Sequence, residues 1–138
     1  MDDEALLAVL HEAATAVRRA LDRLGDWGLA GTRPGQYRSD LVADEAATEV
    51  LLASGCGVMS EESGDHHAER TVIVVIDPVD GSTNASRHLP WFATSLCALD
   101  GRGPRAAVVV NQASGARFEA TRGGGARCDG RPITPSPC

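Results

Sequence analysis

The sequence of 138 residues has few aromatic side chains, no cluster of basic residues, no Cys-x-x-Cys spacing and no long apolar run. The net charge is −6, and without a basic cluster to reverse it this charge argues against a general role at nucleic acids or membrane surfaces. No apolar stretch approaches the roughly 20 residues needed to cross a bilayer. Acidic residues follow the first methionine, which is the wrong charge for a signal or transit peptide. These absences favour a soluble protein.

The four cysteines are scattered along the chain rather than paired. They are Cys56, Cys97, Cys128 and Cys138. Because no two of them have Cys-x-x-Cys spacing, disulfides and a zinc site are both less favoured than free thiols. Reduced thiols in the cytoplasm are the favoured interpretation.

Helical periodicity appears twice in the first half of the chain. Residues 3–24 place apolar side chains on one face of a helix, which Gly25 ends. Residues 41–53 form a second expected helix, and this helix carries Asp44. A loop rich in glycine joins the two helices.

Short apolar segments separated by turn residues follow the two helices. They are expected as strands at residues 58–61, 71–77, 94–99, 105–111, 117–120 and 126–128. A short helix at residues 82–88 is expected between the second and third strands. Two helices followed by a run of antiparallel strands predict an α+β layer, with both helices packed on a largely antiparallel sheet. The length suits a single domain, residues 1–138.

The most informative stretch is residues 74–84, Val-Val-Ile-Asp-Pro-Val-Asp-Gly-Ser-Thr-Asn. Asp77 and Asp80 stand at the end of an apolar strand, with a proline between them, and can share metal ions there. Gly81 lets the backbone approach an anion, and the amides from Ser82 onward can open a helix whose N-terminus favours phosphate. Carboxylates for hard cations beside amides for phosphate indicate a metal-dependent phosphatase. A solvated transition from strand to turn would explain the two aspartates alone equally well.

Three motifs together resemble the inositol monophosphatase family of magnesium-dependent phosphomonoesterases. Asp-Pro-Val-Asp-Gly-Ser-Thr-Asn, residues 77–84, resembles the family signature. Met-Ser-Glu-Glu-Ser-Gly, residues 59–64, resembles the upstream Glu-Glu metal motif. Ser-Asp-Leu-Val-Ala-Asp, residues 39–44, resembles the Asp-Leu-Val-Thr segment and its following aspartate, shortened by two residues. The resemblance covers about the N-terminal half of the family's usual chain and implies the same α+β layer.

The resemblance implies a set of metal ligands. Glu61, Asp77 and the backbone carbonyl of Val79 are expected to hold a first ion. Asp77 and Asp80 are expected to hold most of a second ion. Mg²⁺ is favoured and Mn²⁺ can replace it, because all of these ligands are hard oxygens.

The resemblance also implies how water and phosphate are held. Ser82 takes the position of a threonine that, together with Asp44, orients and activates the attacking water. The amides of Gly81 and Ser82 are expected to bind phosphate oxygens. The residues expected to contact substrate are Glu61, Val79, Asp80, Gly81 and Ser82.

This sequence departs from the family pattern in its second half. The family completes its second metal site with the aspartate of a Trp-Asp pair, whereas Trp27 precedes glycine and Trp91 precedes phenylalanine here. An arginine, Arg38, stands near the position of a family lysine. We therefore expect an N-terminal metal-binding domain with little or no turnover alone, which associates as a homodimer or with a complementary C-terminal half.

Several functions remain open at this point. The favoured substrate is inositol monophosphate or a similar small phosphorylated polyol. A sugar bisphosphate, a nucleotide 3′-phosphate or histidinol phosphate would use the same chemistry. A module that binds metal or phosphate without catalysis, or an interaction partner for a separate half, is the alternative from another class.

Overall fold

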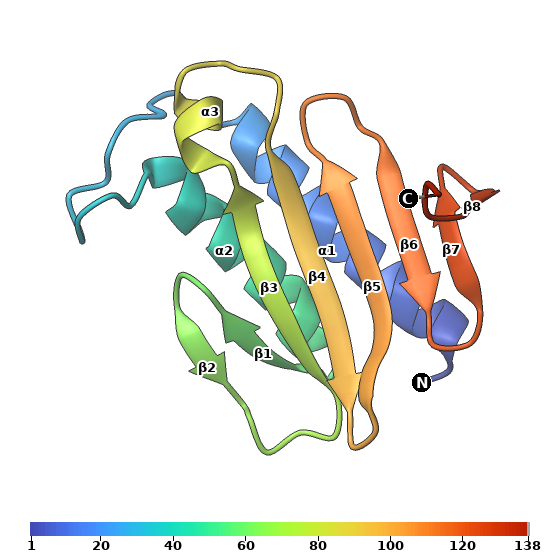
Figure 1. The fold of residues 1–138 in the computed structure, drawn as a ribbon. Coiled ribbons are helices and arrows are strands. Elements are labelled where there is room, and N and C mark those ends of the chain that lie inside the picture. The colour runs from blue at the N-terminus through green and yellow to red at the C-terminus, as the bar shows by residue number, and fades with distance from the viewer. Residues whose placement is uncertain (138) are drawn as a thin grey trace.

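Two helices cover one face of an eight-stranded sheet in the computed structural model, which describes residues 1–137 (Figure 1). The covering helices are α1 (Asp3–Asp22) and α2 (Arg38–Ala53), and a short helix, α3 (Ser82–Ser86), lies at one end of the sheet. The strands are β1 (Gly57–Ser60), β2 (Gly64–His66), β3 (Ile73–Asp80), β4 (Ala93–Asp100), β5 (Gly103–Asn111), β6 (Arg117–Thr121), β7 (Gly125–Cys128) and β8 (Arg131–Ile133). The α+β layer predicted from the sequence is confirmed.

The strand order is β2-β1-β3-β4-β5-β6-β7-β8, and β1 and β3 form the parallel pair of an otherwise antiparallel sheet. Parallel neighbours end at the same edge of a sheet. The residues that follow β1 therefore lie beside the end of β3. This topology brings the Glu-Glu motif to the Asp-Pro-Val-Asp segment.

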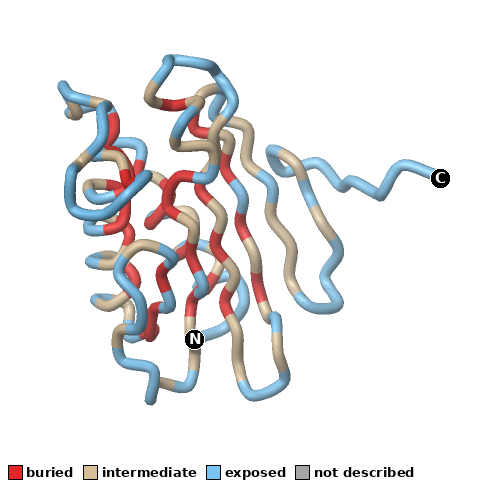
Figure 2. Tube along the Cα trace, turned by 60° about the vertical axis from the view of Figure 1, so that its left-hand side comes forward, coloured by how far each residue is buried: buried red, intermediate tan, exposed pale blue. Residues whose placement is uncertain are grey.

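The core lies between the helices and the sheet, where the buried segments concentrate (Figure 2). Strand β5 shows the expected alternation, since Val108 and Val110 are buried towards the helices while Val109 is exposed on the opposite face. Burying one such side chain stabilises a fold by roughly 1.5–3 kcal/mol relative to leaving it exposed. The far strands β7 and β8 lie mostly exposed beyond this core (Figure 2).

Several element boundaries differ from those predicted. Helix α2 begins at Arg38 rather than at residue 41, because the Asp40 carboxylate accepts a hydrogen bond from the Tyr37 amide (2.8 Å) and caps the first turn. Strand β3 continues to Asp80 rather than ending at residue 77, because a bulge lets its pairing with β4 resume beyond Pro78. Strand β2 was not among the expected strands, and it pairs with β1.

Two further expectations concern the cysteines and the membrane. Cys56, Cys97 and Cys128 are free thiols, and Cys138 lies outside the described residues. No helix within residues 1–137 is long and apolar enough to cross a membrane.

Candidate metal and phosphate site

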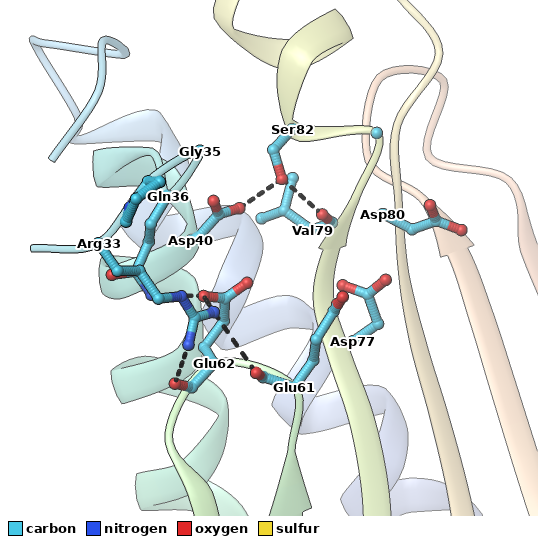
Figure 3. Close-up of a pocket in the computed structure, with 12 residues that line it drawn as sticks. Arg33, Gly35, Gln36, Asp40, Glu61, Glu62, Asp77, Val79, Asp80 and Ser82 are labelled. Atoms are coloured by element: carbon cyan, nitrogen blue, oxygen red, sulfur yellow. Dashed lines mark hydrogen bonds and ion pairs between the residues drawn. The ribbon is translucent and has the colours of Figure 1, made fainter.

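Glu61 and Asp77 face each other at the edge of the sheet where β1 and β3 end (Figure 3). Ser60 and Ile76 are paired in the parallel ladder, and each of the two acidic residues comes directly after one of them. The Glu61 amide also donates to the Ile76 carbonyl at 3.1 Å. The register of the parallel pair therefore holds these two carboxylates side by side, as the sequence motifs predicted.

Asp80 reaches the same region through the bulge in β3. Asp77 pairs with Ser95 and Asp80 pairs with Ala93, so residues 78 and 79 of β3 together face Thr94 of β4. The extra residue bends the strand. Asp80 is exposed at the end of β3, and its charge is one cause of the perturbed pKa of Asp77.

The crowding of carboxylates perturbs Asp77. Burial and then the hydrogen bond and charge of Glu61 raise the pKa of Asp77 from 3.8 to about 7, with smaller contributions from Asp80 and Glu62. The Oδ1 atom of Asp77 is buried and has no hydrogen-bond partner within residues 1–137. An unpaired buried carboxylate oxygen is costly, so this site favours a proton or a cation.

The donor set at this edge fits a hard divalent cation. No three His, Cys, Asp or Glu side chains of residues 1–137 already stand together as a complete metal site. The unpaired oxygen of Asp77, the facing carboxylate of Glu61 and the Val79 carbonyl are nevertheless all oxygen donors, which Mg²⁺ and Mn²⁺ prefer. A cation bound there would satisfy the orphaned oxygen and offset the repulsion between the carboxylates.

Ser82 contacts Asp40 rather than the predicted Asp44. The Ser82 hydroxyl donates to the Asp40 Oδ1 at 2.5 Å and to the Val79 carbonyl at 2.8 Å, so two acceptors share its single proton (Figure 3). Asp40 is 3% exposed, and its other oxygen caps α2 at Tyr37. Both oxygens are therefore fixed, and Asp40 is positioned to accept a proton from Ser82.

Asp44 lies one helical turn further along α2 and takes another partner. Its carboxylate accepts a hydrogen bond from the Ser60 hydroxyl in the interior, and Asp44 does not line the cavity at the site. The predicted pairing of Asp44 with Ser82 is therefore wrong. Asp40 and Asp44 lie on the same face of α2, one turn apart, and it is the first turn, which carries Asp40, that lies beside Ser82.

Gly81 occupies a backbone position that only glycine adopts easily. Its φ angle is +92°, and a β-carbon added there would lie 3.0 Å from the Trp91 carbonyl oxygen. Gly81 is the N-cap of α3, so Gly81 and Ser82 open the short helix as the sequence motif predicted.

A loop between α1 and α2 closes the remaining side of the site. The Glu62 carboxylate accepts a hydrogen bond from Gln36 (2.5 Å) and forms an ion pair with Arg33 (2.7 Å) (Figure 3). Burial raises the pKa of Glu62, partly offset by these partners. Sequence reasoning missed both partners, because nothing in this loop marks a residue that contacts the Glu-Glu motif 26 or 29 positions later.

Together these residues enclose a cavity of 250 Å³ whose lining is mainly polar. Its walls are formed by Arg33, Pro34, Gly35, Gln36, Asp40, Glu61, Glu62, Asp77, Val79, Asp80, Gly81 and Ser82. The cavity thus unites the three sequence motifs, with Glu61 and Asp77 on one side and Asp40 beside Ser82, at the start of α3, on the other (Figure 3).

The model of the inositol monophosphatase family matches residues 4–138. The chain belongs to the inositol monophosphatase family. Members of this family are generally metal-dependent. The match includes all three motifs that converge on the cavity.

Two phosphatases among the relatives of this chain have similar sequence identities to it. The fructose-1,6-bisphosphatase/inositol-1-monophosphatase of Archaeoglobus fulgidus is 36% identical over 103 residues, covering 70% of this chain and 40% of that protein. The inositol-1-monophosphatase of Mesorhizobium japonicum is 34% identical over 140 residues, covering 91% of this chain and 51% of that protein.

Solved structures of the family share the fold described above. The extragenic suppressor protein SuhB of Bartonella henselae superposes with a TM-score of 0.81 at 27% identity, over 93% of this chain and 53% of that one. The inositol monophosphatase of Anabaena gives a TM-score of 0.78 at 26% identity, over 96% and 50%. The chain therefore spans about half, or less, of the length of the proteins it matches.

Proposed function

We propose that this chain supplies the metal- and phosphate-binding half of a phosphomonoesterase that hydrolyses inositol monophosphate or another small polyol phosphate. One observation carries the proposal. The Asp77 carboxyl group faces Glu61 and has one buried oxygen without a partner within residues 1–137, and the same cavity holds a serine hydroxyl that is bound by a buried aspartate. Family membership supports the reaction class.

Glu61, Asp77, Asp80 and the Val79 carbonyl are proposed to hold Mg²⁺, with Mn²⁺ as a substitute. The carbonyl oxygen of Val79 already accepts a bond from Ser82 and has a second lone pair available. A divalent cation there would neutralise charge on the phosphate and on the leaving oxygen.

Ser82 and Asp40 are proposed to orient the attacking water. The water oxygen forms a bond to phosphorus as the ester P–O bond breaks. Its proton passes to the Ser82 oxygen while the Ser82 proton moves to Asp40, and the leaving alkoxide gains a proton from solvent. Asp40 takes the role that sequence comparison assigned to Asp44, because Asp40 is the residue in contact with Ser82.

The phosphate is proposed to lie at the start of α3, on the amides of Gly81 and Ser82. Gly81 has no side chain to cover its backbone, and its positive φ angle is one that glycine adopts easily. Arg33 lines the same cavity and is the cationic side chain among its walls. A substrate with a second phosphate, such as a sugar bisphosphate, would find a counter-charge there, and one relative named above is also a fructose-1,6-bisphosphatase.

Location and assembly are further parts of this proposal. Free thiols at Cys56, Cys97 and Cys128 suit the reducing cytoplasm. A complementary C-terminal half, or a second copy of this chain, would complete the site. A module that binds cations without catalysis remains the second candidate, favoured by the incomplete set of carboxylate ligands in residues 1–137.

Calorimetric titration of Mn²⁺ and Mg²⁺ into the purified 138-residue chain tests the metal assignment. We expect weak binding that is abolished in Asp77→Asn and reduced less in Asp80→Asn, since Asp77 contributes the buried, unpaired oxygen. Asp65→Asn, in the exposed strand β2, is the matched control and should bind as the wild type does. Unchanged binding in Asp77→Asn would remove the basis of the proposal.

Phosphate release from inositol 1-phosphate separates the two candidate functions. The isolated chain is expected to turn over very slowly or not at all. Cation binding without turnover, even with a complementary C-terminal half supplied, would favour the non-catalytic module. Magnesium-dependent turnover that is lost in Asp40→Asn would favour the enzyme.

A further inference from the structure

A chain of hydrogen bonds runs through the interior from α1 to the bulge of β3. The Gln112 side-chain amide donates to the Ala14 carbonyl (3.0 Å) and to the Thr94 hydroxyl (2.8 Å). The Thr94 hydroxyl donates to the Pro78 carbonyl at 2.9 Å. Thr94 is fully buried and Gln112 is 3% exposed. These two polar side chains therefore have no access to solvent partners.

The chemistry of the four groups gives this chain of hydrogen bonds one direction. The carbonyls of Ala14 and Pro78 can only accept hydrogen bonds. Thr94 must therefore give its single proton to Pro78, which leaves its lone pairs to accept from Gln112. Gln112 in turn uses both amide hydrogens, one on Thr94 and one on Ala14. Every member is satisfied, which makes such a buried network rigid.

This chain of hydrogen bonds ends at the segment that carries the proposed cation ligands. Pro78 is buried within the bulge, directly between Asp77 and Val79. Thr94 is the residue of β4 that faces the bulge. Pro78 has no N–H, so its carbonyl is the hydrogen-bonding group of that residue, and Thr94 fixes its direction. Fixing this carbonyl fixes the peptide plane that joins Pro78 to Val79.

We propose that Thr94 and Gln112 are positioning residues for the cation site, an inference that rests on the proposed function. Thr94 holds the bulge so that the Val79 carbonyl and the flanking carboxylates keep their places at the cavity. Gln112 holds Thr94 and ties it to α1 through Ala14. Neither side chain lines the cavity.

A purely structural role for the pair makes a different prediction. Loss of a buried hydroxyl would then lower stability without changing affinity for a cation. A positioning role lowers the affinity itself, and outer partners of metal ligands typically contribute about 10–100-fold to it. The two roles are therefore separated by measuring Mn²⁺ affinity on folded variants.

The test compares Thr94→Val with wild type by calorimetric titration of Mn²⁺ into the 138-residue chain. The substitution keeps the shape of the side chain and removes the hydroxyl, and a loss of at least about tenfold in affinity is expected. Thr94→Ser keeps the hydroxyl and should restore binding to within a few fold of wild type. Wild-type affinity in Thr94→Val would overturn the proposal.

Thr48→Val is the matched control. The Thr48 hydroxyl on α2 is also buried, and it has no hydrogen-bond partner within residues 1–137. The same chemical change there should leave Mn²⁺ affinity unaltered, and an equal loss in both variants would overturn the proposal.

Where Thr94→Val fails to fold, Gln112→Met replaces it, because that variant keeps the hydrogen bond from Thr94 to Pro78 and removes only the hydrogen bonds that Gln112 donates to Thr94 and Ala14. A smaller loss of affinity is then expected, and no loss would overturn the proposal.

Amide NMR of the cation-free chain separates this inference from the proposed function. The amides of Val79, Asp80 and Gly81 should shift and exchange faster in Thr94→Val, and should stay unchanged in Thr48→Val. A wild-type chain that binds no Mn²⁺ would refute the proposed function, while these amides would still report on the hydrogen-bond chain. Unperturbed amides in Thr94→Val would overturn the positioning role.

Discussion

At the scale of single residues, Asp77 is a carboxyl group whose surroundings oppose its charged form. It has one buried oxygen without a partner within residues 1–137, and Glu61 is the acidic neighbour that raises its pKa most. Its raised pKa means that the fold resists the ionised form. The carboxylate is thus kept at a cost to stability, which is expected of a group retained for binding rather than for folding.

The raised pKa of Asp77 predicts how stability changes with pH. The residue titrates near 3.8 in an unfolded chain and near 7 in the fold, so the folded chain holds the extra proton between these values. Without a cation, the contribution of Asp77 therefore becomes less favourable as pH rises from about 4 to about 7. Asp77→Asn cannot ionise, so its free energy of unfolding should rise relative to that of the wild type over this range. The difference should be on the order of 1 kcal/mol at pH 8, after allowing for solvent screening.

Urea unfolding of both proteins at several pH values in a chelating buffer measures this difference. Adding Mg²⁺ at pH 8 should stabilise the wild type and leave Asp77→Asn unaffected. Asp65→Asn serves again as the exposed control. A difference between wild type and Asp77→Asn that does not grow with pH would contradict the assignment of the raised pKa.

At the scale of elements, the start of α2 decides which aspartate serves the site. Asp40 joins two elements, because one oxygen caps α2 at Tyr37 and the other accepts from Ser82 at the start of α3. The cap fixes where the helix begins and therefore which residues of its first turn face the end of β3. A single side chain thus sets both a helix boundary and a contact in the site.

Asp40→Ala should destabilise the chain by about 1–3 kcal/mol, since it removes a helix cap and one of the two acceptors of the partly buried Ser82 hydroxyl. Urea denaturation at pH 7 measures this loss. The neighbouring Ser39 is a matched control, because its hydroxyl is buried and has no partner within residues 1–137, so Ser39→Ala should cost little. Equal losses in the two variants would show that the cap contributes nothing specific.

At the scale of the whole molecule, the two faces of the sheet differ. Helices α1 and α2 cover one face (Figure 1), while the opposite face exposes apolar side chains. Among these exposed side chains are Met59, Val75, Val109 and Phe118. An apolar face of this kind favours association.

We expect the isolated chain to dimerise or form larger assemblies at micromolar concentrations, as sedimentation velocity would show. Val109→Lys places a charge on the open face and should shift the population towards monomer. Leu29→Lys changes an exposed apolar residue in the loop between α1 and α2, away from that face, and should have no such effect. A compact wild-type monomer at all of these concentrations would contradict the expectation.

Much of the fold could be predicted from local patterns, and the misses have physical causes. The short apolar segment at residues 105–111, bounded by turn residues, predicted β5, and Asp77 and Glu61 were predicted as neighbours from their motifs. Strand β2 was missed because its residues are polar and it depends on pairing with β1 rather than on burial. The role of Asp40 was missed because the second helix was predicted to begin at residue 41, just after it, and the family resemblance assigned the role to Asp44.

The sequence by itself determined the layer of helices on a sheet, because helical periodicity and short apolar segments between turn residues are local properties of the chain. Burial of the apolar side chains then stabilises the layer. It also determined which residue types gather at the end of β3. The tertiary structure alone decided that Asp40 contacts Ser82, that Asp77 keeps an unpaired oxygen, and that Gln112 joins α1 to the bulge through Thr94. Each of these depends on groups brought together from distant parts of the chain, whose relative orientation is fixed only when the helices dock on the sheet.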